Sequence, residues 1–148
     1  MRFLIPAVDK LETLHSGGVV VGQQVKINIK NLEQVGIEYR THVSNVGWQN
    51  VVTDGQTSGD ESQSNWIEAI QVKLSGDKAS DYDIYYRSHV AEMGWLDWAK
   101  NGELSGTQGY AYAVQAIQIV LVPKGSSAPG KTLVPFKTGT VNLQYQAY

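Results

Sequence analysis

Residues 85–106 read YYRSHVAEMGWLDWAKNGELSG, and residues 38–59 read EYRTHVSNVGWQNVVTDGQTSG. The two stretches align without a gap, and because they begin at residues 85 and 38 the spacing is 47 residues. The same spacing relates Ala-Ile-Gln at 69–71 to Ala-Ile-Gln at 116–118. A period of this length indicates a repeated supersecondary unit that needs neighbouring units to complete its core.

The side chains of each copy alternate between two faces, which is typical of half-buried β-strands. In the first copy, Ile37, Tyr39, Thr41 and Val43 alternate with Glu38, Arg40, His42 and Ser44. Gly47 should interrupt this strand, residues 48–52 should form a second strand, and Asp54-Gly55 should turn the chain. The polar residues 57–64 are expected to form a loop, followed by a last strand over 66–74.

The ends of the chain supply the material for a third unit. Residues 24–27 match residues 71–74 at the same spacing, and the tail 131–148 ends in an alternating pattern. We therefore predict one all-β domain, 1–148, with units at 37–76 and 84–123 and a third unit split between 1–30 and 131–148. A closed pseudo-threefold structure would leave no exposed sheet edge. A β-prism is favoured, because the first and last strands should pair in one sheet, and a β-trefoil is the alternative.

The composition excludes several function classes. The chain has 148 residues, no cysteine and a net charge of −2, so disulfides and Cys-ligated zinc are absent and nucleic acid is not an expected partner. No apolar stretch reaches the ~20 residues of a membrane helix, so we expect no membrane insertion. Residues 1–10 do not read as a secretory signal, because Pro6 and Asp9 break the apolar run. Export by another route, a leader absent from this sequence and a role inside the cell remain open.

The repeated motif resembles a known family. His42 to Gly59 with Ala69 to Leu74, and His89 to Gly106 with Ala116 to Leu121, resemble the clostridial hydrophobic W (ChW) repeat. The resemblance implies tandem repeats on an extracellular or cell-surface protein of Gram-positive bacteria, a role in adhesion or polymer binding, and no common catalytic activity. The chain departs from the pattern at Val51, where the second copy has Trp98, and its terminal unit has no Gly-Trp.

Trp48 and Trp95 are the first candidates for ligand binding, since an exposed indole can stack on the apolar face of a sugar ring. The alternative is that both indoles pack in the core or at a strand corner. Trp66 and Trp98 occur in one copy only, and we expect one of them to be exposed.

Two further groups of residues complete the candidate sites. Asp54 with Gln56 and Asn101 with Glu103 lie at turn tips, where they either bind sugar hydroxyls or serve only the turn. His42 and His89 share a strand face with Arg40 and Arg87, an arrangement that suits either an anion site or a tie between strands.

Enzyme activity is not expected, because no nucleophile elbow or phosphate loop occurs and duplicated positions favour repeated binding sites. We expect no catalytic residue, no metal site and no cofactor. The first hypothesis is a multivalent, lectin-like module that binds a glycan or cell-wall polysaccharide, with each site pairing an indole and an Asx-Gly turn. The second is a protein–protein adhesion or assembly module, including self-association, with an apolar patch that carries Trp66 or Trp98.

Overall fold

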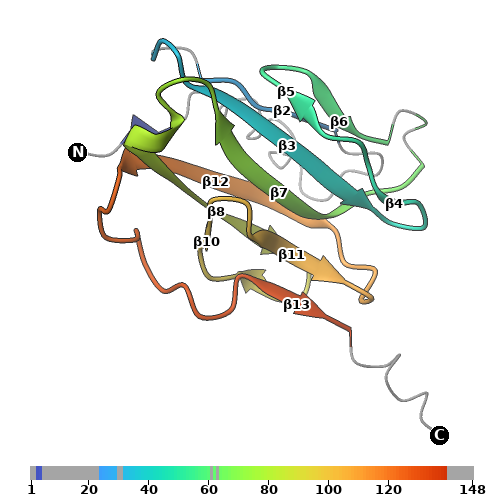
Figure 1. Ribbon diagram of the computed structural model, residues 1–148. Helices are drawn as coiled ribbons and strands as arrows, with labels where there is room; N and C mark the ends of the chain where they lie inside the picture. The colour runs from blue at the N-terminus through green and yellow to red at the C-terminus, as the bar shows by residue number, and fades with distance from the viewer. Residues whose placement is uncertain (1–2, 5–23, 30–31, 61, 63, 140–148) are drawn as a thin grey trace, which may run out of the picture.

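The computed structural model describes residues 3–4, 24–29, 32–60, 62 and 64–139 (Figure 1). This part of the chain is built from β-strands with one short 3₁₀ turn, so the all-β prediction is confirmed. In order, the elements are β1 (Phe3–Leu4), β2 (Gln24–Lys26), β3 (Gly36–Val43), β4 (Gly47–Trp48), β5 (Val52–Thr53), β6 (Thr57–Gly59), β7 (Ile67–Ser75), η1 (Ala79–Asp81), β8 (Tyr82–Val90), β9 (Gly94–Trp95), β10 (Ala99–Lys100), β11 (Leu104–Gln108), β12 (Val114–Pro123) and β13 (Phe136–Thr138).

Two pairs of long antiparallel strands, β3 with β7 and β8 with β12, form the centres of two sheets. Short strands flank each pair in the same way: β4 and β5 pair with β3, and β9 and β10 pair with β8. Each long pair also has an irregular register at one end, beside the Gly-Trp strand. The twin segments therefore fold alike, and the internal repeat predicted from the sequence is confirmed.

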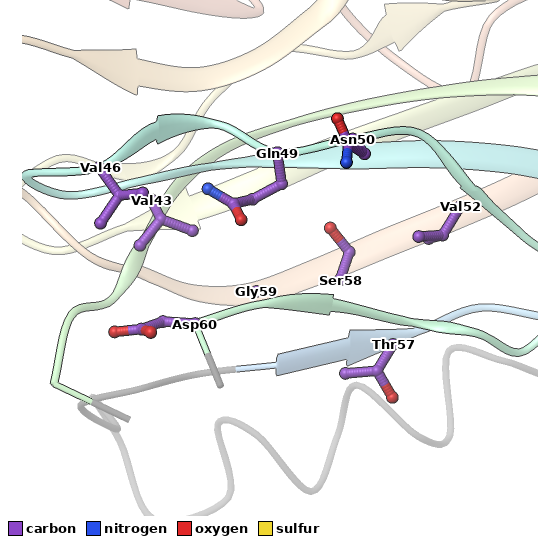
Figure 2. Close-up of a pocket in the computed structure, with 9 residues that line it drawn as sticks. All are labelled: Val43, Val46, Gln49, Asn50, Val52, Thr57, Ser58, Gly59 and Asp60. Atoms are coloured by element: carbon purple, nitrogen blue, oxygen red, sulfur yellow. The ribbon is translucent and has the colours of Figure 1, made fainter. Parts of the chain in front are cut away.

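The sequence-based expectation for residues 57–64 was wrong in part. Thr57–Gly59 forms strand β6, which pairs antiparallel with β2 (Figure 2). In the second unit, β11 pairs antiparallel with β7. The sequence predicted a loop here because the residues of β6 are small and polar, and because its partner strand belongs to the preceding unit. Gly106 explains why glycine recurs there, since a Cβ at this position would lie 2.7 Å from Ala69 Cα. Residues 48–52 likewise form two short strands and not one.

A buried tyrosine joins the second unit to the strand before it. The Tyr86 hydroxyl accepts a hydrogen bond from the Val72 N–H at 3.1 Å and donates to the Glu103 carbonyl. Tyr86 is fully buried, and burial raises the pKa of its phenol well above the ordinary value. The hydroxyl therefore stays protonated and satisfies two backbone groups that belong to different units.

The first unit repeats this link with β2. Tyr39 accepts from the Ile27 N–H at 3.0 Å and donates to the Gln56 carbonyl, while Val25 pairs with Ser58. Ile27 thus takes the place of Val72, so β2 aligns with β7 at a spacing of 45 residues and not at the 47 inferred from the sequence. A slip of two residues keeps each side chain on its face, so side-chain alternation could not reveal it.

The two ends of the described chain lie in different sheets. β1 pairs with β12 in the five-stranded sheet, whereas β13 runs parallel to β11 in the six-stranded sheet. Among the described residues, neither sheet closes into a barrel. The predicted terminal strand near 141–146 lies outside the described residues, so its predicted pairing with the first strand is not tested.

One core runs between the two pairs of long strands and includes residues of both units and of β2. Its largest fully buried side chains are Tyr39, Tyr86, Ile27, Ile37, Ile67, Ile70, Ile84, Ile119, Leu121 and Val25. The inward face of β3 follows the predicted alternation, with Ile37, Tyr39, Thr41 and Val43 buried. Among the described residues, no helix is long and apolar enough to cross a membrane.

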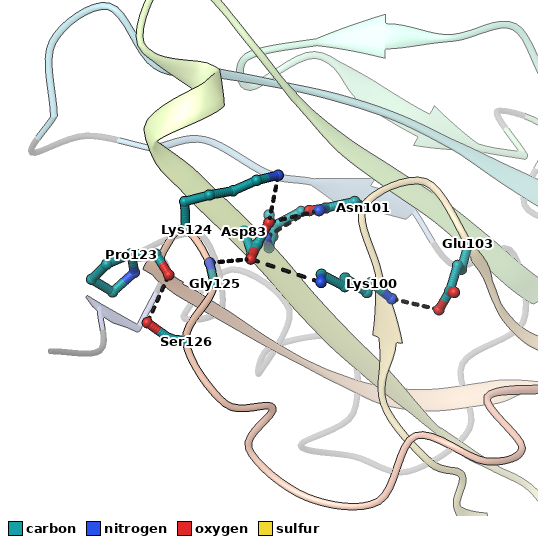
Figure 3. Close-up of polar contacts among 9 residues, drawn as sticks. Asp83, Lys100, Asn101, Glu103, Pro123, Lys124, Gly125 and Ser126 are labelled. Carbon is teal, nitrogen blue, oxygen red and sulfur yellow. Dashed lines mark hydrogen bonds and ion pairs between the residues drawn. The ribbon is translucent and has the colours of Figure 1, made fainter.

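A buried carboxylate anchors the segment that follows β12 (Figure 3). Asp83 accepts from the Gly125 N–H and the Asn101 side chain, each at 2.9 Å, and lies 3.1 Å from Lys124 Nζ and 3.8 Å from Lys100 Nζ. Burial raises the pKa of Asp83, but these hydrogen bonds and the two cations outweigh it and leave the pKa below the ordinary value.

Replacing Tyr86 with Phe should lower the free energy of unfolding by about 1–3 kcal/mol, because the Val72 N–H and the Glu103 carbonyl lose their buried partner. Urea denaturation followed by circular dichroism measures this loss. Tyr110→Phe is the control, because the Tyr110 hydroxyl has no hydrogen-bond partner among the described residues. Equal stability of the two variants would show that the buried hydroxyl contributes nothing.

Asp83→Asn should destabilise the protein by about 1–3 kcal/mol at pH 7, because a charged acceptor is lost. A carboxylate whose pKa is depressed by folding stabilises fully above its unfolded value, and this contribution is lost as the pH falls through the folded value. The difference between Asp83→Asn and the parent should therefore shrink below about pH 4. Urea denaturation across pH 2.5–7 measures it, with the exposed Asp77→Asn as the control. A difference that does not change with pH would contradict the assignment.

Candidate functional site

The outer face of β8 carries a cluster built around Arg87. The guanidinium lies over two indoles, with its carbon 4.5 Å from the Trp95 ring centre and 4.8 Å from that of Trp98. Arg87 Nε donates to Gln118 Oε1 at 2.7 Å, which fixes the plane of the guanidinium. Burial lowers the pKa of Arg87 from its ordinary value, but the guanidinium remains a cation at neutral pH.

His89 completes this cluster by contacting Trp95. The imidazole meets the indole edge to face, with ring centres 5.1 Å apart, and its Nδ1 bonds to Gln115 Oε1 at 2.8 Å. Trp95 retains 38% of its surface and is the most exposed aromatic side chain among the described residues. The indole therefore contacts both Arg87 and His89 and still offers surface to a ligand.

The first unit builds the same cluster on β3. Arg40 lies 4.6 Å from the Trp48 ring centre and donates from Nε to Gln71 Oε1 at 2.6 Å. His42 meets Trp48 at 5.2 Å and bonds through Nδ1 to Glu68 Oε1 at 2.9 Å. Burial raises the pKa of the Glu68 carboxyl, and the adjacent His42 opposes this shift. Arg, His and Trp thus share a face in both units.

The two clusters differ at one position. Trp98 is 7% exposed and packs in a second small core with Tyr85, Val120 and Val122. We expected one of Trp66 and Trp98 to be exposed, and the structure excludes Trp98. The segment after β12 covers this core, where the backbone N–H of Trp98 donates to the Lys131 carbonyl at 2.8 Å. A hollow of about 270 Å³ remains above the cluster, lined by Arg87, Trp95, Leu96, Asp97, Trp98, Pro129, Gly130 and Lys131.

The Asx-Gly turns lie away from the indoles. In the register of the first unit, Trp48 is opposite His42, whereas the Asp54 N–H bonds to the Ile37 carbonyl. Five residues of extended strand separate these positions by about 16 Å. The structure therefore does not bring an indole and an Asx-Gly turn into one site.

The side chains of both turns are used within the turns or by the adjacent strand. Gln56 and Glu103 accept from the backbone N–H of Thr53 and Lys100, at 2.7 and 2.8 Å. Asp54 and Asn101 accept from the N–H of Ile37 and Ile84, at 2.9 and 2.8 Å. Asp54, Gly55, Asn101 and Gly102 all have positive φ, as a tight turn of this kind requires.

The first unit has a larger hollow that sequence reasoning missed (Figure 2). It measures about 440 Å³ and lies between β6 and the segment that carries β4 and β5, with Val43, Val46, Gln49, Asn50, Val52, Thr57, Ser58, Gly59 and Asp60 as its lining. The second unit has leucines at the positions of Gln49 and Thr57, and Leu96 packs in its core. Unequal polarity at these equivalent positions was the available sequence signal.

Asp60 lines this hollow and orders the loop after β6. Its two carboxylate oxygens accept from Ser62, Ser64 and Asn65. The hydrogen bond from the Ser62 hydroxyl, with those from the backbone, lowers the pKa of Asp60 to about 2. The carboxylate is therefore ionised at neutral pH and is already committed to the loop.

Trp66 is half-buried, and its indole N–H has no hydrogen-bond partner among the described residues. Neither Trp66 nor Trp98 is among the exposed large hydrophobic side chains of the described residues. The described residues also contain no cluster of three or more His, Asp or Glu side chains that could hold a metal ion.

The family described as Clostridial hydrophobic W (ChW) matches the chain twice, at residues 42–76 and 89–123. Neither the curated proteins nor the solved structures contain a significant match to the chain. Each matched segment begins at the histidine of one cluster and runs to the end of the second long strand of the same unit, or just past it. The chain therefore contains two ChW repeats, one in each of its two units.

Proposed function

We propose that this protein is a non-enzymatic binding module for a carbohydrate or another cell-surface polymer. The observation that carries the proposal is the duplicated outer-face cluster, in which a partly exposed indole is held by Arg and His in both units. Two copies of one surface feature suit a ligand that is itself repetitive.

The chemistry of the cluster suits a polyhydroxylated ligand. An indole offers the apolar face on which a sugar ring can stack, and Trp95 has the exposed surface to do so. In the 270 Å³ hollow beside it, Asp97 and Lys131 supply groups for hydroxyls. A guanidinium with one nitrogen bonded to Gln118 keeps further donors for a hydroxyl or a carboxylate.

The proposed sites are weak alone and gain strength together. Linked sites convert the second binding event into an intramolecular one, so two modest affinities add up on a polymer. This use of the molecule fits an extracellular or cell-surface location, which we propose together with the ligand class. No catalytic step is part of the proposal.

Protein–protein adhesion or assembly is the second candidate function. Val46, Val51 and Leu133 are 54–85% exposed, and Val51 lies beside the first cluster. Exposed apolar side chains favour contact with a protein partner. They are dispersed over the described surface, so we rank this function second.

For the fold, we propose that residues 1–30 and 131–148 form the third unit of a closed pseudo-threefold structure, a β-prism in preference to a β-trefoil. The pairing of β2 with β6, which repeats that of β7 with β11, supports a unit before the first. An experimental structure in which the terminal strands do not pair would refute this arrangement.

The Trp95→Ala and Trp48→Ala variants should each weaken binding to the polymer by about tenfold or more, because each removes a stacking surface worth over 1 kcal/mol. Binding to a panel of glycans and bacterial cell-wall polysaccharides identifies the ligand, and titration calorimetry measures the loss. The double variant should lose binding altogether.

Gln56→Ala and Glu103→Ala serve as matched controls, because these side chains bond to their own turns, and they should change affinity less than twofold. Asn50→Ala tests the hollow of Figure 2. A polymer that binds equally well to both Trp variants but not to Asn50→Ala would place the ligand in that hollow and refute the role of the clusters.

A further inference from the structure

We propose that the open side of Arg40 in the first unit is a binding site for an aromatic side chain of a partner protein. This inference goes beyond the proposed polymer binding, because it concerns the face of the guanidinium that Trp48 does not cover. The second unit shows what fits beside this arginine: the Trp98 ring centre lies 4.8 Å from the guanidinium carbon of Arg87, which also contacts Trp95.

The first unit has a hollow where the second unit has this indole. Val51 occupies the position of Trp98, and a hollow of about 240 Å³ is lined by Glu38, Tyr39, Arg40, Val51, Gln71 and Lys73. Among the described residues, Trp48 is the one aromatic ring that stacks with Arg40, whose guanidinium carbon lies 4.6 Å from the Trp48 ring centre. The hydrogen bond to Gln71 at 2.6 Å holds the guanidinium in the same orientation as Arg87. The site for a second ring is therefore preorganised.

The rim of this hollow differs from its counterpart in a way that suits an outside ligand. Trp98 rests on Tyr85, Val120 and Val122, and the chain itself covers it. At those three positions the first unit has Glu38, Lys73 and Ser75. Glu38 and Lys73 form an ion pair at 3.8 Å with both side chains partly exposed. A permanently covered core would not carry this pair, so the hollow is suited to reversible binding.

The chemistry of the hollow selects an aromatic group over a sugar. A guanidinium attracts the electron-rich face of a ring, and the attraction rises as water is excluded between the two stacked rings. A sugar ring presents C–H groups that do not attract a cation in this way. The exposed side chain of Val51 adds apolar surface. The occupant is thus an indole or phenol ring.

A polypeptide is the source of the ring that the site favours. In the second unit the indole arrives on a main chain, between β9 and β10, and is held by neighbouring backbone. The Glu38 and Lys73 rim offers one acceptor and one donor, which match the N–H and C=O groups that flank an aromatic residue in a peptide. Aromatic anchors in such pockets are typical of protein–protein interfaces.

N-acetyl-tryptophanamide tests the inference as a probe of the side chain and its flanking amides. In the parent protein, the Arg40 Nε–H resonance should shift in a saturable manner, while the Arg87 Nε–H resonance should barely respond because Trp98 already fills its site. N-acetyl-leucinamide should produce no saturable shift. No saturation for the aromatic probe, or equal responses to the two probes, would overturn the inference.

Two substitutions exchange the sites. Val51→Trp should fill the first hollow and abolish the response of Arg40, and Trp98→Val should make Arg87 respond to the probe. Where Val51→Trp does not fold, Val51→Phe serves the same purpose. Trp98→Val also provides a thermal readout, since a ligand that binds the folded state raises its melting temperature.

Two further experiments distinguish between the possible occupants of the hollow. A saccharide that shifts Arg40 when the aromatic probe does not would overturn the inference. Self-association that Val51→Trp abolishes would assign the hollow to a second copy of this chain and overturn the claim of a separate partner. The inference is independent of polymer binding through Trp95, because Val51→Trp should leave the effect of Trp95→Ala on that binding unchanged.

Discussion

The tyrosine hydroxyl at each unit boundary is the interaction on which the rest of the structure depends. Tyr86 joins the backbone of β7 to the turn that precedes β11, and Tyr39 does the same between β2 and the turn that precedes β6. A repeat of this kind cannot close its own core, so the contact between units has to be specified. A buried hydroxyl with two backbone partners specifies it, because any other register leaves polar groups unsatisfied.

This boundary also explains the order of strands. The third short strand of each unit is placed by the turn that the tyrosine holds. It then pairs with the strand that precedes its unit, β11 with the long strand β7 and β6 with the short strand β2. The Asx-Gly turns therefore have a structural task at the unit boundary. Their polar side chains complete the turn and cap the start of the long strand, which leaves the outer face of the sheet to the Arg, His and Trp clusters.

Much of this could be predicted from the sequence, because a gapless repeat exposes equivalent positions. The alternation along residues 37–43 gave the buried face of β3, and the common face of Arg40 and His42 followed from it. Pairing between units could not be predicted, since Thr57 and Gly59 carry no apolar pattern. The burial of Trp98 depends on residues 124–131, a Pro-, Gly- and Ser-containing stretch that reads as a linker until Asp83 is seen to hold it.

The differences between the two repeats carry more information about function than their common features. Arg and Trp recur with the same geometry and define the surface that the two units share. The exchange of Trp98 for Val51 does not follow from the fold, because it leaves Arg40 stacked on one side beside an exposed valine. The second unit satisfies the same arginine with its own indole and a covering segment. Arg40 therefore has room for a second aromatic ring beside the one that Trp48 supplies. Arg87, which contacts both Trp95 and Trp98, shows the size and shape of the ring that would fit.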